Sequence, residues 1–175
     1  YSSAASDVYK RQPQNSPWRQ WYLRGLVNIE DCPSLGFALL TSNVTVSSSN
    51  FLFRRKLWQR LGGFSTHRFC HDWDFLMRSV LHAEPCFVRK PLLGYRVHAT
   101  NSTASLRGVQ EAEVADALNR YLSAVCTTTP ENPLAPSPCH WPNTFPMFLD
   151  KRPFHFDDRV IKDFVAPSLL PLIHR

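Results

Sequence analysis

The segment spanning residues 72–82 constrains the fold of this chain more than any other. Its apolar side chains recur at the spacing of one helix face, and they are Trp73, Leu76, Met77, Val80 and Leu81. Such a stripe predicts an amphipathic helix that buries one side against a core. Just before it, Gly62-Gly63 provides the left-handed stop that ends a helix, so a shorter helix is expected over residues 54–61.

Further elements are expected on both sides of these two helices. Stretches of mixed apolar and polar residues predict helices over residues 18–29 and 105–125, and a short one around residues 159–165. Short apolar or alternating runs predict strands of a buried sheet, at residues 37–40, 44–46, 86–88 and 95–97. Strands and helices are therefore interleaved in the expected order.

The net charge and the cysteine content limit which classes of binding partner and which cellular compartment are expected. The 175 residues carry a formal net charge of +6, which favours polyanionic partners such as nucleotide diphosphates or anionic lipid surfaces. The basic residues are scattered rather than gathered into a stripe, so no nucleic-acid partner is expected. The five cysteines are widely spaced and include no C-x-x-C pair. This pattern indicates a reducing compartment, taken as the cytoplasm, rather than a disulfide framework or a zinc knuckle.

The two ends of the chain are expected to lie outside the main domain. Residues 2–12 resemble the in-frame translation of an adapter used to build sequencing libraries, so residues 1–12 are excluded from the fold and the coding sequence is taken to start near Pro13. Residues 126–175 begin with a stretch rich in proline, threonine and asparagine, which predicts a linker and an irregular or helical extension. The domain itself is assigned to residues 13–125.

Two carboxylates open the helix expected at residues 72–82. Asp72 and Asp74 point about 200° apart around a helix axis, so they cannot both face one substrate. Arg78 follows Asp74 at i+4 and is expected to pair with it on the helix surface. Asp72 is left as either a helix N-cap or a functional carboxylate. The Asp-x-Asp spacing is not interpreted as a metal site, because an amphipathic helix begins there.

Four motifs in this order resemble the acceptor half of inverting family 2 glycosyltransferases. They are Asn50-x-x-x-Arg54-Arg55, Gly62-Gly63-Phe64, His71-Asp72-Trp73-Asp74 and Tyr95-Arg96-Val97-His98 followed by Asn101. The resemblance covers residues 39–125 and implies an α/β fold. That fold would be the C-terminal part of the Rossmann-like, A-type fold of nucleotide-diphospho-sugar transferases, without its N-terminal nucleotide-binding half.

The resemblance also implies roles for individual residues. The family carries an acidic pair, commonly Glu-Asp, at this helix start, and its aspartate is the catalytic base, which matches Asp72. His71 stands where the glutamate is usual. His98 would approach a Mg²⁺ or Mn²⁺ ion or the diphosphate. Roles in binding substrate are implied for Asn50, Arg54, His71, Trp73, Arg96 and Asn101.

Structural explanations remain open for several of these residues. Trp73 begins the apolar stripe and fits the core as well as a sugar platform. Arg54 fits a solvated basic helix face as well as the lining of an acceptor site. His98 fits a surface histidine at the end of a strand. The sequence alone does not choose between these alternatives.

The activity implied by the resemblance is transfer of a sugar from a nucleotide-diphosphate donor to an acceptor hydroxyl with inversion. The acceptor would be a glycan, a lipid-linked compound or another alcohol, and the basic charge allows peripheral contact with the cytoplasmic face of a membrane. Without a donor half, the present chain is expected to be inactive by itself. The alternative is a non-catalytic module that binds glycans or anionic surfaces.

Overall fold

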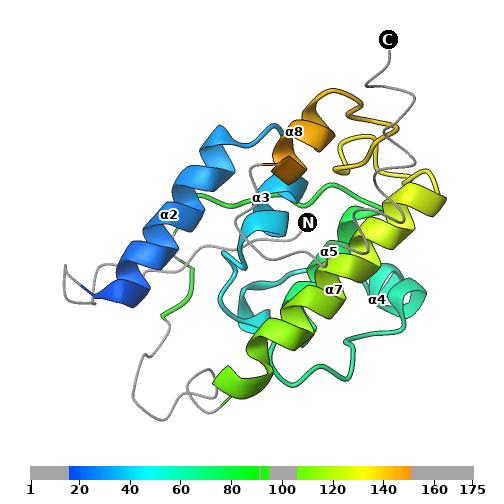
Figure 1. Cartoon of the computed structure of the whole chain (residues 1–175). Helices are drawn as coiled ribbons and strands as arrows, with labels where there is room; N and C mark the ends of the chain where they lie inside the picture. Colours follow the sequence, from blue (N-terminus) through cyan, green and yellow to red (C-terminus); the bar gives the residue numbers. More distant parts are fainter. Residues whose placement is uncertain (1–15, 91, 95–105, 151–175) are drawn as a thin grey trace.

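The computed structural model describes residues 16–90, 92–94 and 106–150, and this part of the chain is helical. The helices lie in the order shown in Figure 1, and they are α2 (Pro17–Asp31), α3 (Leu35–Thr41), the 3₁₀ turn η1 (Ser48–Asn50), α4 (Arg55–Leu61), α5 (His71–Val80), α7 (Arg107–Thr127) and α8 (Thr144–Asp150). Among these residues no helix is both long and apolar enough to cross a lipid bilayer.

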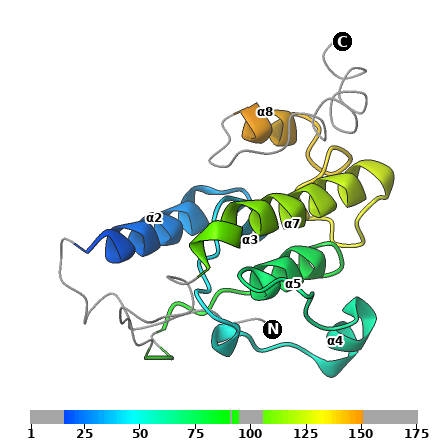
Figure 2. The same ribbon diagram turned by 60° about the horizontal axis from the view of Figure 1, so that its bottom comes forward.

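The helices are arranged in layers around α3. Helices α5 and α7 pack side by side, α3 lies against α5, and α2 contacts the other side of α3 (Figure 2). Helix α4 contacts α5 at the edge of this arrangement. Helix α8 approaches α3 through Phe148, whose ring centroid lies 5.0 Å from that of Phe37. The stack places α3 in the middle of the molecule.

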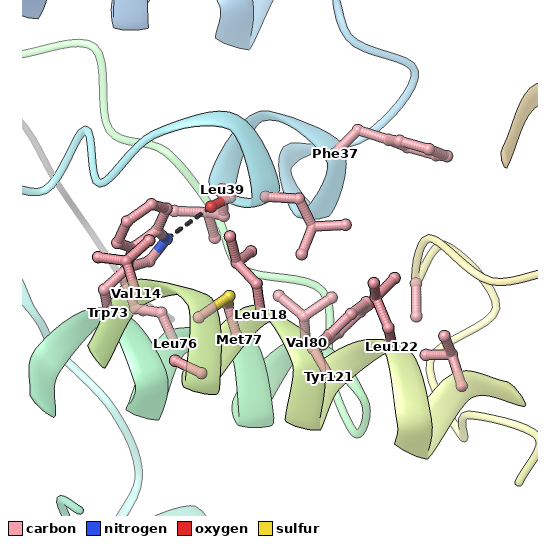
Figure 3. Packing of buried hydrophobic residues seen from close by; sticks show 14 of the residues in the cluster. Phe37, Leu39, Trp73, Leu76, Met77, Val80, Val114, Leu118, Tyr121 and Leu122 are labelled. Atoms are coloured by element: carbon pink, nitrogen blue, oxygen red, sulfur yellow. Dashed lines mark hydrogen bonds between the residues drawn. The ribbon is translucent and has the colours of Figure 1, made fainter. Parts of the chain in front are cut away.

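The core forms where α3 meets the pair of α5 and α7 (Figure 3). From α5 come the stripe residues Leu76, Met77 and Val80, and from α7 come Leu118 and Leu122, all at most 3 % exposed. Each such side chain contributes about 1.5–3 kcal/mol when it leaves water. The stripe that predicted the helix at residues 72–82 is therefore the one that holds α5 in place.

The α/β fold expected from the sequence is wrong for the described part of the chain. No extended strand occurs there, and Leu93 alone takes part in an isolated β-bridge. The apolar run at residues 37–40 lies in α3 instead, where Phe37, Leu39 and Leu40 are at most 2 % exposed. A short run buried on every side carries no period, so its sequence does not separate a strand from a helix turn.

The other expected strands also differ from the structure or lie outside it. Residues 44–46 form a turn, in which Val46 has a φ of 65°, far from the value near −120° that a strand requires. Residues 86–88 have no regular secondary structure and pair with no strand within the described chain. The run at residues 95–97 and the short helix expected at residues 159–165 lie outside the described residues.

The expected helices at residues 18–29, 54–61, 72–82 and 105–125 are confirmed, with ends shifted by a few residues. The double-glycine stop after α4 is also confirmed, since Gly62 has a φ of 69° and Gly63 a φ of 80°. The residues assigned to a linker pack onto the core: Asn132 Nδ2 donates to the carbonyl of Val80 over 2.8 Å, and Tyr121 donates to the carbonyl of Pro136 over 3.0 Å.

Gly63 fixes how α4 is joined to α5. A Cβ atom at Gly63 would lie 2.8 Å from the indole of Trp58, which itself packs against Phe75 of α5 with ring centroids 5.5 Å apart. A Cβ atom at Gly62 would meet nothing within 4 Å. The two glycines therefore share a left-handed backbone but differ in their surroundings.

We expect Gly63→Ala to lower the free energy of unfolding by about 3 kcal/mol, because it adds steric overlap with Trp58 to the cost of a left-handed alanine. Gly62→Ala carries the backbone cost alone, about 1 kcal/mol, and is the matched control. Urea unfolding of both variants measures the difference. Equal losses would show that the close approach to Trp58 has no effect on stability.

Candidate functional site

A pocket of about 310 Å³ opens between the start of α2, the turn after α3 and the adjacent ends of α5 and α7. Its lining residues are Trp18, Trp21, Ser42, Asn43, Val46, Phe69, Cys70, Asp72, Trp73, Gln110 and Val114. The volume lies at the lower end of the range of small-ligand sites, and a mostly apolar wall with a few polar groups is typical of them. The site therefore suits a compact molecule.

Asp72 is the carboxylate of this pocket. It is the second residue of α5, whose N-cap is Cys70, so the N-cap explanation of Asp72 does not apply. Its Oδ1 accepts hydrogen bonds from Asn43 Nδ2 over 3.3 Å and from the Trp73 backbone N–H over 2.7 Å. The side chain is largely buried, and within the described chain it forms no ion pair. Burial raises the pKa of Asp72 above its ordinary value, against the opposing effect of these hydrogen bonds.

Asp74 has the structural role expected for it. Its Oδ2 accepts from Arg78 Nε over 2.9 Å, and its side chain is only 1 % exposed. Arg78 also donates to the carbonyls of Leu61 and Gly63, over 2.6 and 2.8 Å. The prediction of an Asp74–Arg78 pair is thus confirmed, and the pair joins α5 to the turn after α4. Asp72 and Asp74 have no partner in common among these contacts.

Glu113 fixes the start of α5, and with it the position of Asp72. Its carboxylate accepts hydrogen bonds from the backbone N–H groups of Arg68 and Phe69 over 2.9 and 2.6 Å, and from that of Cys70 over 3.4 Å. Desolvation acts to raise the pKa of Glu113, but these hydrogen bonds outweigh it and lower the pKa. A side chain of α7 therefore anchors the backbone that leads into the pocket.

Cys70 lies beside Asp72 but is a poor nucleophile. It is 1 % exposed, and burial together with the nearby carboxylates of Glu113, Asp74 and Asp72 raises its pKa to about 12. Because the thiolate is the reactive form, a thiol with this pKa stays protonated and inert near neutral pH. The surroundings of Cys70 therefore oppose a role for it as a nucleophile.

Aromatic rings form one wall of the pocket. Trp18 stacks on Tyr22 with ring centroids 5.5 Å apart, and Trp21 lies 6.1 Å from Trp18. On the opposite side, the indole N–H of Trp73 donates to the carbonyl of Leu39 over 2.6 Å (Figure 3). Trp73 thus belongs to the core, as one interpretation of its position expected, and it also lines the pocket. Its role as a platform for a sugar stays a prediction.

The remaining residues with expected substrate roles do not line this pocket. Asn50 is buried and donates to the carbonyl of Thr45. Arg54, the residue before α4, is exposed. The ring of His71 packs edge-on against the ring of Phe64, with centroids 5.4 Å apart. The expected site residues Arg96, His98 and Asn101 lie outside the described residues. The structure therefore brings Asp72 and Trp73 to the pocket, but not Asn50, Arg54 or His71.

The resemblance implies a Mg²⁺ or Mn²⁺ ion, which would need a cluster of acidic or histidine ligands. In the ranges given above, no three His, Cys, Asp or Glu side chains come close enough to hold a metal ion. Asp72 and Asp74 diverge, as their contacts show. The described part of the chain therefore does not fit such an ion.

Several pocket residues were not singled out from the sequence. Ser42 and Asn43 follow a helix that was expected to be a strand, so their place beside Asp72 depends on the tertiary fold. Trp18 and Trp21 stand at i and i+3 near the start of α2, a spacing that places two indoles on one helix face. This spacing was the one signal in the sequence for the aromatic wall.

Val46 adds a strained backbone to the pocket wall. A β-branched residue with a positive φ, here 65°, is a genuine outlier that costs about 1–3 kcal/mol. Residues of this kind persist where the surrounding structure fixes them, and they cluster at binding and catalytic sites. The strain at Val46 therefore favours a functional role for the pocket.

No protein-family model, no curated protein and no solved structure matches the chain.

Proposed function

We propose that this chain is the acceptor side of an inverting glycosyltransferase, in which Asp72 removes the proton from an acceptor hydroxyl held in the pocket. The observation that carries the proposal is the surroundings of Asp72: a carboxylate at the start of a rigid helix, inside a pocket, with a raised pKa and no ion-pair partner in the described chain. The motifs around Asp72 support the same reaction.

The chemistry follows from that position. In an inverting transfer, the acceptor oxygen attacks the anomeric carbon as the nucleotide diphosphate leaves from the opposite face. The bond from oxygen to hydrogen breaks, and Asp72 takes the proton. A base whose pKa is raised by burial holds that proton more strongly than an exposed aspartate does, which favours transfer. The donor and any Mg²⁺ or Mn²⁺ ion would be held by residues outside the pocket.

The proposal is tested by replacing Asp72 with Asn in the full-length parent protein and measuring sugar transfer from nucleotide-diphosphate donors. Asp74→Asn serves as the comparison, because Asp74 is two residues away but pairs with Arg78. Loss of transfer with donor binding retained in Asp72→Asn supports the base. Equal activity in that variant would refute the assignment.

A second expected result concerns the donor. We expect the present chain alone to bind a nucleotide sugar only weakly, with a dissociation constant well above the micromolar range. Among the described residues, the pocket is lined by neither lysine nor arginine, and their one charged side chain there is the acidic Asp72, whereas a diphosphate is bound by cations or helix N-termini. Titration calorimetry with a nucleotide sugar measures this affinity. Micromolar binding would show that a donor site lies within this chain.

The second candidate function is a non-catalytic module that binds glycans. The aromatic wall formed by Trp18 and Trp21 is the observation that favours it, because such rings bind sugars without any chemistry. The Asp72→Asn experiment separates the two candidates. A glycan-binding module would show no transfer in the unaltered parent, whereas a transferase would lose a measurable rate.

A further inference from the structure

A series of hydrogen bonds leads from Asn50 through the turn after α3 to the carboxylate of Asp72. Asn50 Nδ2 donates to the carbonyl of Thr45, and the hydroxyl of Thr45 donates to Asn43 Oδ1. Asn43 Nδ2 in turn donates to Asp72 Oδ1 over 3.3 Å. Asn50, Thr45 and Asp72 are at most 7 % exposed, so most of this series is shielded from water. Burial strengthens such a network and fixes the group at its end.

The Thr45 hydroxyl determines which way the amide of Asn43 faces. An ionised carboxylate accepts hydrogen bonds but donates none, so Asn43 turns its NH₂ group toward Asp72. The carbonyl oxygen of Asn43 then accepts from the hydroxyl of Thr45. Without that hydroxyl, the amide oxygen loses its donor, and the amide is free to reverse by rotation about its last side-chain bond. A reversed amide directs a carbonyl oxygen at a negative charge.

The backbone of Thr45 is held on both sides of this contact. Its carbonyl accepts from the Ser47 backbone N–H over 2.7 Å as well as from Asn50. Val46, the residue after Thr45, has the positive φ described above. The strained turn therefore carries the two side chains, Asn43 and Thr45, that lead to Asp72. Asn50, for which the motifs imply a role in binding substrate, supports this turn in the structure.

The hydrogen bonds to Asp72 leave one carboxylate oxygen for a ligand. Those from Asn43 and from the Trp73 backbone N–H both go to Oδ1, and within the described chain no other residue donates to Oδ2. In the proposed transfer, the acceptor O–H bond breaks as its oxygen bonds to the anomeric carbon, and the diphosphate leaves with the bonding electron pair. The proton then goes to Oδ2 of Asp72.

We propose that Thr45 is a positioning residue for Asp72: its hydroxyl holds the amide of Asn43 so that Asn43 fixes Oδ1 and leaves Oδ2 to take the proton. This inference rests on the proposed function and deepens it, because it names the accepting atom and a residue outside the motifs. Thr45 is not among the described residues that line the pocket, so it acts through Asn43. If its hydroxyl served the turn alone, removing it would change stability but not the titration of Asp72.

The other titratable groups near Asp72 are unchanged by a substitution at Thr45. Burial, the largest cause, raises the pKa of Asp72, and the charge of the neighbouring His71 lowers it. Cys70 stays neutral, since burial and nearby carboxylates raise its pKa to about 12. Glu113 of α7 is bound to the backbone N–H groups before α5. The described side chains of α2 and of the turn after α3 that line the pocket are uncharged.

The test follows the pKa of Asp72 by NMR of its side-chain carboxyl carbon in the 175-residue chain. Thr45→Val removes the hydroxyl and nearly keeps the shape of the side chain, whereas Thr45→Ser restores a hydroxyl. We expect Thr45→Val to raise the pKa of Asp72, because the donor that favours the ionised form is lost, and Thr45→Ser to leave it near the value of the unaltered chain. An unchanged or lowered pKa in Thr45→Val, or an equal rise in both variants, would overturn the proposal.

A second measurement needs no variant and covers the case in which Thr45→Val does not fold. In the unaltered chain, the NH₂ signals of Asn43 and the hydroxyl proton of Thr45 should both shift with pH along the titration of Asp72, because the three groups are joined in series. The NH₂ signals of Asn28, which donates to Thr41 Oγ1 instead, are the matched control. The proposal is wrong if either signal fails to follow Asp72.

The third readout is transfer in a protein that joins this chain to a donor-binding half. We expect Thr45→Val to lower transfer by about tenfold on the acid side of the pH profile, the effect of losing one hydrogen bond to a charged group. A raised pKa keeps the base protonated to higher pH, so the acid limb of the profile should move upward in pH. Thr45→Ser should restore the profile, and Thr127→Val, at an exposed threonine of α7, should not alter it.

These measurements fail independently of the proposed base. A pKa of Asp72 that responds to Thr45, together with full transfer in Asp72→Asn, would leave the positioning role standing and refute the base. Transfer that depends on Asp72, with neither the pKa nor the pH profile responding to Thr45→Val, would support the base and overturn the role of Thr45.

Discussion

Under the proposed transferase function, replacing Asp72 with Asn in a protein that joins this chain to a donor-binding half is expected to lower the rate of sugar transfer by about 10²–10⁴-fold, the usual contribution of a positioned general base. Asparagine has the same shape, and its carbonyl oxygen can still accept the hydrogen bond from the Trp73 backbone N–H. It cannot take a proton from the acceptor. Because the substitution is confined to the pocket, the affinity for the donor should be unchanged, which calorimetry measures alongside the rate.

The same variant is expected to keep or gain stability, which separates chemistry from folding. Burial raises the pKa of Asp72 in the folded state, so this group stabilises the fold when it is protonated. That contribution is present below the unfolded pKa and is lost as the pH rises through the folded pKa. Near neutral pH the ionised Asp72 therefore opposes folding, whereas asparagine stays neutral.

Urea midpoints of the Asp72→Asn variant and the unaltered protein provide the control. We expect the variant to be at least as stable near neutral pH, with the difference shrinking in acid as Asp72 becomes protonated. A variant that is inactive because it unfolds would show the opposite order. Its loss of transfer would then say nothing about the base.

The sequence was sufficient to predict the elements with a clear period and a clear stop. Helix α5 carries an apolar stripe that is offset by polar residues, and α4 ends at a left-handed Gly62, so the residue pattern alone locates both helices. The run at residues 37–40 has no polar residues among its apolar ones, because α2, α5 and α8 cover it on all sides. A fully buried run loses the alternation that distinguishes a strand from a helix, so this run was wrongly expected to be a strand. The wrong α/β assignment also rested on the resemblance to family 2 glycosyltransferases, whose fold the described part of the chain does not share.

The site was predicted only in part, for a related reason. Asp72 and Trp73 are neighbours in a helix whose orientation the sequence indicates, so their place in the pocket follows from local geometry. Ser42 and Trp21 reach the same pocket through contacts between α2, α3 and α5. Such contacts depend on how the helices cross. Helix α2 approaches the turn after α3 closely at Gly25, and the sequence shows this contact only as a glycine within a helix.

Asp74→Asn is expected to lower the free energy of unfolding by about 3 kcal/mol, in contrast to the substitution two residues earlier. The Asp74 side chain is 1 % exposed, and the variant leaves the Arg78 guanidinium without its anionic partner. Breaking a buried ion pair from one side typically costs about 3–5 kcal/mol, and Arg78, which is 25 % exposed, keeps its hydrogen bonds to Leu61 and Gly63. Urea unfolding measures the loss.

The chain offers a matched control in the second Asp–Arg pair at the same i, i+4 spacing. Asp116 pairs with Arg120 on α7, and Arg120 also lies 3.9 Å from Asp74 Oδ1, a contact that Asp116→Asn leaves in place. The Asp116 side chain is 55 % exposed, so this variant should cost less than about 1 kcal/mol. Equal losses in the two variants would show that burial adds nothing to the Asp74 pair. The proposed function gives Asp72 a chemical role, whereas the contacts of Asp74 give it a structural one. Under that proposal we expect transfer by Asp74→Asn to persist wherever the variant is folded, as in the presence of a stabilising osmolyte. Transfer by Asp72→Asn should stay absent under the same conditions.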